Sequence, residues 1–100
     1  MGGYTYIWEF RVRPESAVEF ERAYGPDGDW VKLFCRAVGY ESTMLLRDTV
    51  DGQRYLTIDR WRSEDDYREF HRRFAAEYGE LDQRCAGLTV HERALGTFNG

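Results

Sequence analysis

The 100-residue sequence predicts a single domain over residues 1–100 with an α+β fold, in which a four-stranded antiparallel sheet carries helices on one face. Three observations predict this fold. Residues 4–13 alternate apolar and polar side chains, as a half-buried strand does. Residues 40–61 have the pattern of a β-hairpin, and residues 63–85 have the pattern of a capped amphipathic helix.

The first strand and the first helix meet at Pro14. One face of the strand carries only aromatic or apolar side chains, namely Tyr4, Tyr6, Trp8, Phe10 and Val12. Pro14 ends the strand and suits the first turn of a helix. Ala17, Phe20 and Tyr24 then follow helical spacing within residues 15–24, and the Gly-Pro-Asp-Gly run at 25–28 ends that helix.

A second short helix and a hairpin follow. Asp29 is predicted to cap the helix, and its apolar positions recur at helical intervals as Trp30, Leu33, Phe34 and Ala37. Gly39 suits the end of this helix. Residues 40–48 and 53–61 read as strands, and Asp51-Gly52 between them favours a tight turn.

The last helix and the last strand complete the chain. Ser63 and Asp66 form a capping-box-like signal. The helix behind it has one apolar stripe of Tyr67, Phe70, Phe74, Tyr78, Leu81 and Cys85, with Gly79 as the predicted kink or break and Gly87 as the end. In the strand over residues 88–98, we expect Leu88, Val90, Ala94 and Phe98 on one face, and His91, Arg93 and Leu95 on the other.

The element order is that of the split βαβ, or ferredoxin-like, arrangement. Its helices cover one face of the sheet, yet both faces of the predicted strands carry apolar side chains. The uncovered face would be a large exposed apolar patch in a monomer. The sequence therefore predicts a homodimer that pairs two sheets face to face.

Composition excludes several classes of function. The net charge of −4 and the lack of a basic run argue against nucleic acid as a partner. Cys35 and Cys85 lack the spacing of a disulfide framework or a zinc site, and we expect both as small hydrophobic residues on helix faces. No phosphate-binding loop, dinucleotide fingerprint or metal-ligand spacing is present, so no cofactor is predicted. With no signal peptide or membrane span, a cytoplasmic protein without membrane contact is expected.

Several motifs together resemble the antibiotic biosynthesis monooxygenase domain family of the dimeric α/β-barrel superfamily. They are YIWEFRVRP at 6–14, WVKLF at 30–34, GYEST at 39–43, YLTIDRWRS at 55–63 and LGTF at 95–98. The resemblance implies a ferredoxin-like protomer, a dimer whose two sheets form a barrel, and a pocket between sheet and helices. Some family members oxidise aromatic polyketides with dioxygen and no cofactor, and others degrade haem.

The resemblance favours the oxidising branch over the haem-degrading branch. The haem-degrading branch combines an asparagine, a tryptophan and a histidine, whereas this chain has Phe70 near the tryptophan position and Glu9-Phe10 in place of the asparagine. The oxidising branch has a tryptophan late in the third strand, an asparagine four residues earlier and a tyrosine six residues later. Trp61 and Tyr67 match that spacing, and Thr57 replaces the asparagine.

The predicted function is that of a cofactor-independent monooxygenase or tailoring enzyme acting on an aromatic or polyketide-like small molecule. Such a reaction needs a dry pocket that binds an anion and accepts its proton. The predicted catalytic residues are Trp61, Tyr67 and His71, and the predicted substrate-binding residues are Tyr55, Thr57, Asp59, His91 and Arg93. The alternative is a non-catalytic dimeric barrel that binds a small apolar ligand, and Thr57 favours it.

Each predicted site residue also has a structural interpretation. A strand-end tryptophan such as Trp61 is more often part of a core or an interface, and Tyr67 lies on what is first of all a packing stripe. His71 would more often lie on a solvated helix flank. His91 and Arg93 would either hold an anionic substrate or pair across a dimer. Asp59 would be either a base or the partner of an arginine.

Overall fold

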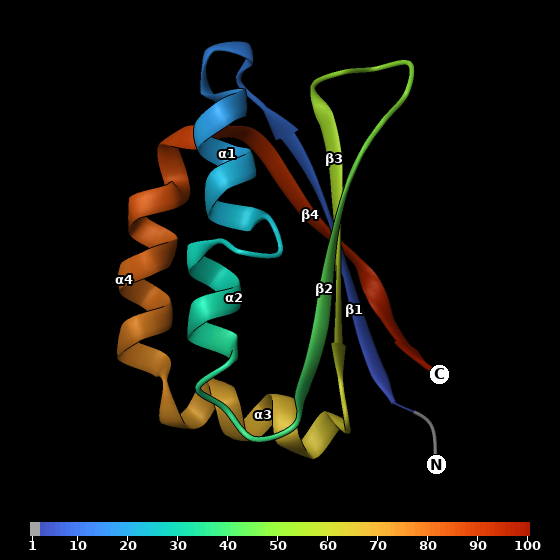
Figure 1. Ribbon diagram of the computed structural model, residues 1–100, viewed down its shortest axis with the longest axis vertical. Helices are drawn as coiled ribbons and strands as arrows, with labels where there is room; N and C mark the ends of the chain where they lie inside the picture. The colour runs from blue at the N-terminus through green and yellow to red at the C-terminus, as the bar shows by residue number, and fades with distance from the viewer. Residues whose placement is uncertain (1–2) are drawn as a thin grey trace.

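The computed structural model describes residues 3–100, so Met1 and Gly2 of the predicted domain lie outside the described residues. The elements in chain order are β1 (Tyr4–Val12), α1 (Ala17–Tyr24), α2 (Asp29–Phe34), β2 (Tyr40–Arg47), β3 (Arg54–Trp61), α3 (Glu64–Arg73), α4 (Ala75–Cys85) and β4 (Thr89–Asn99). All strand pairs are antiparallel, in the order β2-β3-β1-β4. The helices lie on one face of this sheet (Figure 1), which confirms the predicted ferredoxin-like α+β fold.

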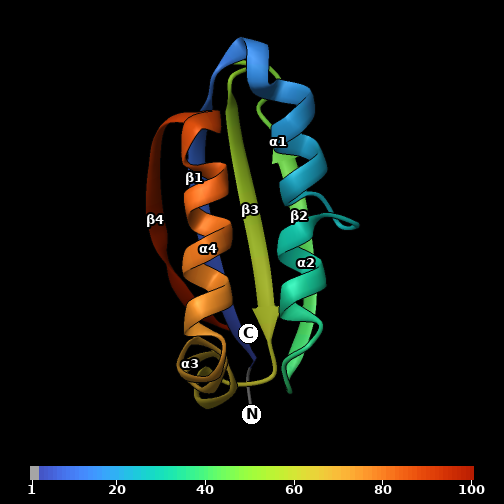
Figure 2. The same cartoon turned by 90° about the vertical axis from the view of Figure 1, so that its left-hand side faces the viewer.

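The helical layer consists of two columns and a crossing segment. In Figure 2, α1 and α2 follow one another beside β2 and β3, and α4 runs alongside them over β1. The shorter α3 crosses the lower end of the sheet and leads into α4. The core lies between this layer and the sheet, and its most deeply buried large side chains are Val12, Phe20, Tyr55, Trp61 and Phe70.

Capping was predicted correctly at one helix and wrongly at another. The Ser63 hydroxyl accepts a hydrogen bond from the backbone N–H of Asp66 at 3.1 Å, as expected for an N-cap. Asp29 is instead the first residue of α2, and Gly28 is the N-cap. A β-carbon at residue 28 would lie 2.4 Å from the carbonyl oxygens of Arg22 and Ala23, so the close approach of α1 leaves room only for glycine.

The long predicted helix breaks at Phe74 and not at Gly79. Phe74 has φ −113° and ψ 27°, outside the helical region, and the chain turns there from α3 into α4. Gly79 lies inside α4 with nothing within 4 Å of its β-carbon position. The break therefore follows the change of direction needed to bring α4 back over the sheet.

Two irregularities alter the predicted faces of β4. The pairing with β1 shifts between Ile7 and Trp8, where Gly96 and Ala94 are the partners, so Leu95 is an extra residue. A second shift lies between Arg11 and Val12. Phe98 consequently pairs with Thr5 on the face away from the helices, and the prediction that it shares a face with Ala94 is wrong.

The face of the sheet opposite the helices carries exposed apolar side chains, as predicted. Met44, Leu46 and Phe98 lie on it with exposed fractions of 50%, 41% and 51%. Of the two cysteines, Cys85 is buried as expected, but Cys35 is exposed just beyond the end of α2. Within residues 3–100, no helix has the length and apolarity needed to cross a membrane.

Candidate functional site

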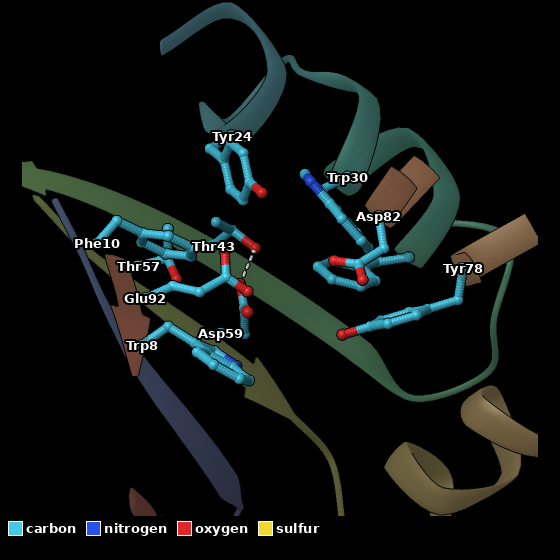
Figure 3. Close-up of a pocket in the computed structure, with 11 residues that line it drawn as sticks. Trp8, Phe10, Tyr24, Trp30, Thr43, Thr57, Asp59, Tyr78, Asp82 and Glu92 are labelled. Carbon is cyan, nitrogen blue, oxygen red and sulfur yellow. Dashed lines mark hydrogen bonds between the residues drawn. The ribbon is translucent and has the colours of Figure 1, made fainter. Parts of the chain in front are cut away.

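A pocket lies between the sheet and helices α1, α2 and α4 (Figure 3). Six aromatic rings, two threonines and three acidic residues line it: Trp8, Phe10, Tyr24, Trp30, Phe34, Tyr78, Thr43, Thr57, Asp59, Asp82 and Glu92. The cavity has a volume of about 60 Å³, which is room for about four or five waters. A ligand larger than a small ring therefore enters only if lining side chains move.

The floor of the pocket is built by strand register. Residues paired across an antiparallel ladder point to the same face. Three such pairs lie side by side on the helix-covered face: Trp8 with Thr57, Phe10 with Glu92, and Thr43 with Asp59. Every strand thus contributes at least one polar or aromatic side chain to the floor.

The roof of the pocket is aromatic. Trp30 on α2 has its ring centroid 5.8 Å from that of Tyr24 and 5.0 Å from that of Tyr78. Tyr78 and Asp82 lie four residues apart on α4 and so face the same side of that helix. Trp30 is 6% exposed, and its indole Nε1 has no hydrogen-bond partner among the described residues.

Asp59 is the partly buried carboxyl on the pocket floor. Its Oδ1 accepts a hydrogen bond from the Thr43 hydroxyl at 2.6 Å, and the Thr43 oxygen lies 2.7 Å from the Tyr40 hydroxyl. Because Thr43 donates its one proton to Asp59, Tyr40 is the donor to Thr43. Burial raises the pKa of Asp59 to about 6, and the Thr43 hydrogen bond acts in the opposite direction.

Asp82 and Glu92 are exposed and lie at the mouth of the pocket. The pKa of Glu92 is raised, first by loss of contact with water and then by the negative charge of Asp82. Within residues 3–100, no group of three or more histidine, cysteine or acidic side chains has the arrangement of a metal site.

Comparison with known proteins assigns the family. The sequence model described as antibiotic biosynthesis monooxygenase matches residues 3–77. The chain belongs to the antibiotic biosynthesis monooxygenase family. No curated protein sequence matches it.

Solved structures share the fold of this family member at low sequence identity. A candidate antibiotic biosynthesis monooxygenase from Bordetella bronchiseptica has a TM-score of 0.81 and 20% identity, covering 100% of this chain and 98% of that one. A variant of SnoaB, a cofactor-independent oxygenase from Streptomyces nogalater, has a TM-score of 0.81 and 22% identity, with 100% and 94% covered. A candidate monooxygenase of the same kind from Nitrosomonas europaea has a TM-score of 0.76 and 15% identity, with 100% and 92% covered.

The pocket of this family member contains two of the residues predicted from sequence, Thr57 and Asp59. Thr57 is 4% exposed and sits on the floor opposite Trp8. No basic side chain within residues 3–100 forms an ion pair with Asp59. Of its two predicted interpretations, the arginine partner is therefore not found.

The predicted catalytic residues form an aromatic layer next to the pocket. Trp61 is fully buried, and its ring centroid lies 5.7 Å from that of Phe34, which lines the pocket. The Tyr67 ring packs on Trp61 at 5.7 Å and on His71 at 4.6 Å. His71 in turn lies 4.7 Å from the lining residue Tyr78. Trp61 and His71 thus each lie behind one lining ring, and Tyr67 lies behind Trp61 and His71.

Burial sets the protonation of this aromatic layer. It raises the pKa of the Tyr67 phenol, with a further contribution from Tyr6, so Tyr67 remains a hydrogen-bond donor at neutral pH. It lowers the pKa of His71, which keeps the imidazole neutral and able to accept a proton. His71 is half-buried, which differs from the fully solvated flank that the helix position alone indicated.

The structure does not bring the remaining predicted residues to the pocket. Tyr55 packs under α1, where its hydroxyl donates to Glu21. His91 and Arg93 lie on the face of the sheet away from the helices, and Arg93 pairs with Glu9 at 3.0 Å. His91 and Arg93 lie between the two irregularities in β4, where the pairing with β1 is regular. They pair there with Arg11 and Glu9, which point away from the helices.

The helix residues of the pocket were missed because their positions resembled ordinary packing. Trp30 and Tyr78 were assigned to apolar helix stripes, which they also form. A signal for Asp82 was available, since it follows Tyr78 by one helical turn. The alternation of a strand also indicated Glu92. Its neighbours His91 and Arg93 were predicted on one face of the strand, so Glu92 was expected on the other.

Proposed function

We propose that the chain is a cofactor-independent monooxygenase that oxidises an aromatic or polyketide-like compound held against Asp59. The observation that carries the proposal is a carboxyl on the floor of an aromatic pocket that has a pKa of about 6 and no ion-pair partner within residues 3–100. A base with this pKa is ionised at neutral pH and accepts a proton more readily than an ordinary aspartate. Family membership and a fold shared with SnoaB, described as a cofactor-independent oxygenase, support the same function.

The reaction we propose converts an activated CH₂ group and dioxygen into a ketone and water. Asp59 takes one proton from the CH₂ group. The negative charge left on the carbon is delocalised over a phenol or enol system. The anion transfers an electron to dioxygen, and recombination forms a carbon–oxygen bond and a peroxide anion. Asp59 returns its proton to the peroxide, the O–O bond breaks, and water leaves with the second hydrogen of the carbon. The aromatic walls support this chemistry by excluding bulk water from the charged intermediates.

Oxygen consumption tests the proposal directly. Purified protein would be mixed with a panel of electron-rich phenols and enols while dissolved oxygen is recorded. Asp59→Asn should lower the rate on any accepted substrate by about 10²-fold or more. Asp65→Asn, which changes an exposed aspartate at the start of α3, is the matched control and should retain the rate. Equal rates for Asp59→Asn and the unmodified chain would exclude Asp59 as the base.

The roles of Trp61, Tyr67 and His71 are part of the same proposal. We assign to them the positioning of the pocket wall, because Trp61 and His71 contact lining rings, Tyr67 packs on both of them, and none of the three lines the cavity. Trp61→Phe and Tyr67→Phe should raise KM or lower kcat by a smaller factor than Asp59→Asn does. A loss as large as that of Asp59→Asn would instead indicate direct participation.

A non-catalytic binding function is the second candidate. Thr57 favours it, because a threonine stands where the oxidising branch of the family has an asparagine, and a hydroxyl offers fewer hydrogen bonds than an amide. Ligand binding without oxygen consumption, together with restoration of oxygen consumption in Thr57→Asn, would support this candidate.

A homodimer is the proposed assembly. The exposed apolar side chains of Met44, Leu46 and Phe98 on the face opposite the helices support association through that face. Light scattering after gel filtration should give the mass of two chains. Leu46→Arg should shift it towards one chain, whereas Val18→Arg, at an exposed apolar residue on α1, should not.

A further inference from the structure

The pocket combines aromatic rings with acidic side chains. Apart from the two threonines, every lining residue is either aromatic or a carboxylic acid. Asp59, Asp82 and Glu92 come from β3, α4 and β4 and approach the cavity from different sides (Figure 3). None of the three forms an ion pair with a basic side chain in residues 3–100.

This lack of partners contrasts with other acidic residues of the chain. Glu9, Asp48 and Asp66 pair with arginines at 3.0, 3.1 and 2.7 Å. The three pocket carboxylates act on one lining residue, because the pKa of Tyr78 is raised first by burial and then in part by the negative charges of Asp82, Glu92 and Asp59. A ligand that enters therefore meets a negative potential, which attracts cations and repels a carboxylate or sulfonate.

The aromatic lining of the pocket points to the same ligand charge. Trp8 and Trp30 both line the cavity, and tryptophan is the side chain that attracts a cation most strongly through its ring face. An aromatic ligand with one cationic group therefore matches both the acidic and the aromatic parts of the lining.

We propose that the pocket selects an aromatic compound bearing a protonated amine, whose ammonium group lies between Asp82 and Glu92 at the mouth. The proposal rests on the proposed function in that it names the charge class of substrate for the same pocket. Proton transfer from this substrate to Asp59 moves a negative charge within the pocket and adds none. The ammonium group thus offsets the two carboxylates at the mouth throughout the reaction.

Three probes that share one ring test this selection. Tyramine, tyrosol and 4-hydroxyphenylacetate carry an ammonium, a hydroxyl and a carboxylate on the same phenol. Binding would be followed in low salt near neutral pH by the NMR shift of the Trp30 indole N–H. Tyramine should bind about tenfold more tightly than tyrosol, and 4-hydroxyphenylacetate should bind most weakly. Added salt should reduce only the difference between the charged and neutral probes.

Variants at the mouth separate a local effect from net charge. Asp82→Asn and Glu92→Gln should each reduce tyramine affinity severalfold and leave tyrosol affinity unchanged. Glu80→Gln removes the same charge from an exposed position of α4 that does not line the cavity, and it should retain the preference for tyramine. Equal affinities for the three probes, tighter binding of the carboxylate, or no binding of any probe would each overturn the proposal.

This experiment does not depend on turnover. Preference for tyramine without oxygen consumption on any amine-bearing phenol would leave the selection intact and remove the oxygenase function. Oxygen consumption on neutral phenols without a preference for tyramine would leave the oxygenase function intact and remove the selection.

Discussion

Replacing Asp59 by asparagine should make the protein more stable at neutral pH. Asparagine is nearly isosteric and can still accept the hydrogen bond from Thr43. The native pKa of about 6 lies above the ordinary value of 3.8 because burial disfavours the carboxylate. This difference corresponds to about 3 kcal/mol of destabilisation once the group is ionised in both states, at about 1.4 kcal/mol for each pKa unit.

The sign of the pH dependence follows from proton binding. Between about pH 4 and pH 6 the folded chain keeps the Asp59 proton while the unfolded chain has lost it, so the folded state binds more protons. The free energy of unfolding therefore falls as the pH rises through this window and levels off above it. Asp59→Asn removes this contribution, so its advantage should be near zero at pH 4 and close to its full value at pH 7.5.

Urea unfolding followed by tryptophan fluorescence measures this difference. Curves for both proteins at pH 4 and pH 7.5, at one protein concentration, give the free energy of unfolding of the variant relative to that of the unmodified chain at each pH. Taking that difference cancels the other titrating groups, including Glu92. Asp65→Asn should show no such pH-dependent gain, since Asp65 is exposed. An equal pH dependence for Asp59→Asn and the unmodified chain would refute the assignment of a raised pKa.

Three further changes test the fold, each by urea unfolding at neutral pH. Phe70→Ala should lower the free energy of unfolding by about 3–5 kcal/mol, because Phe70 is 1% exposed and its loss leaves a cavity; a loss below about 1 kcal/mol would contradict this packing. Ser63→Ala should lower it by about 1 kcal/mol through loss of the cap on α3, and Ser63→Asp should restore most of it. Gly79→Ala should raise it by about 0.5–1 kcal/mol, because the position is helical and open; destabilisation there would indicate a kink.

The fold was predictable because local signals agreed with one another. The apolar face of β1, the Ser63 cap and the aromatic stripe of the last helix each specify an element without reference to the rest of the chain. The break at Phe74 was not predictable in this way, because it depends on where α3 meets the end of the sheet. Glycine inside a strand often marks a bulge, so Gly96, with φ +150°, was an available signal for the changed face of Phe98.

The pairing of Thr43 with Asp59 was beyond the sequence signals. A two-residue turn at Asp51-Gly52 would pair residue 43 with residue 60. The actual connection is longer, with the Asp48 carboxylate accepting from the backbone N–H groups of residues 50 and 51 at 2.8 and 2.9 Å. Arg47 therefore pairs with Tyr55, and Thr43 lies opposite Asp59. Since a one-residue change of register reverses every side chain, the hydrogen bond at the site depends on this loop.

The catalytic residues predicted from the family resemblance lie next to the pocket and do not line it. Trp61 and Tyr67 have the spacing of the oxidising branch, but Phe34 lies between Trp61 and the cavity. The open space lies along β3 at Thr57 and Asp59, towards the middle of the sheet. Spacing along a strand can predict the face and approximate height of a site, while the depth of the cavity depends on helix side chains that a strand motif does not contain.

The lack of an ion-pair partner for Asp59 within residues 3–100 is the strongest argument that the pocket is functional. Arginine supplies 13 of the 14 basic residues, and this chain uses it to neutralise acidic side chains on both the sheet and the helices. An arginine within reach of Asp59 would lower its pKa and stabilise the folded state. The structure instead surrounds this carboxyl with rings and a single threonine donor, which keeps its pKa near neutral at a cost in stability. A group that destabilises the fold in its charged form, and has the pKa of a useful base, is better explained by chemistry at the pocket than by packing.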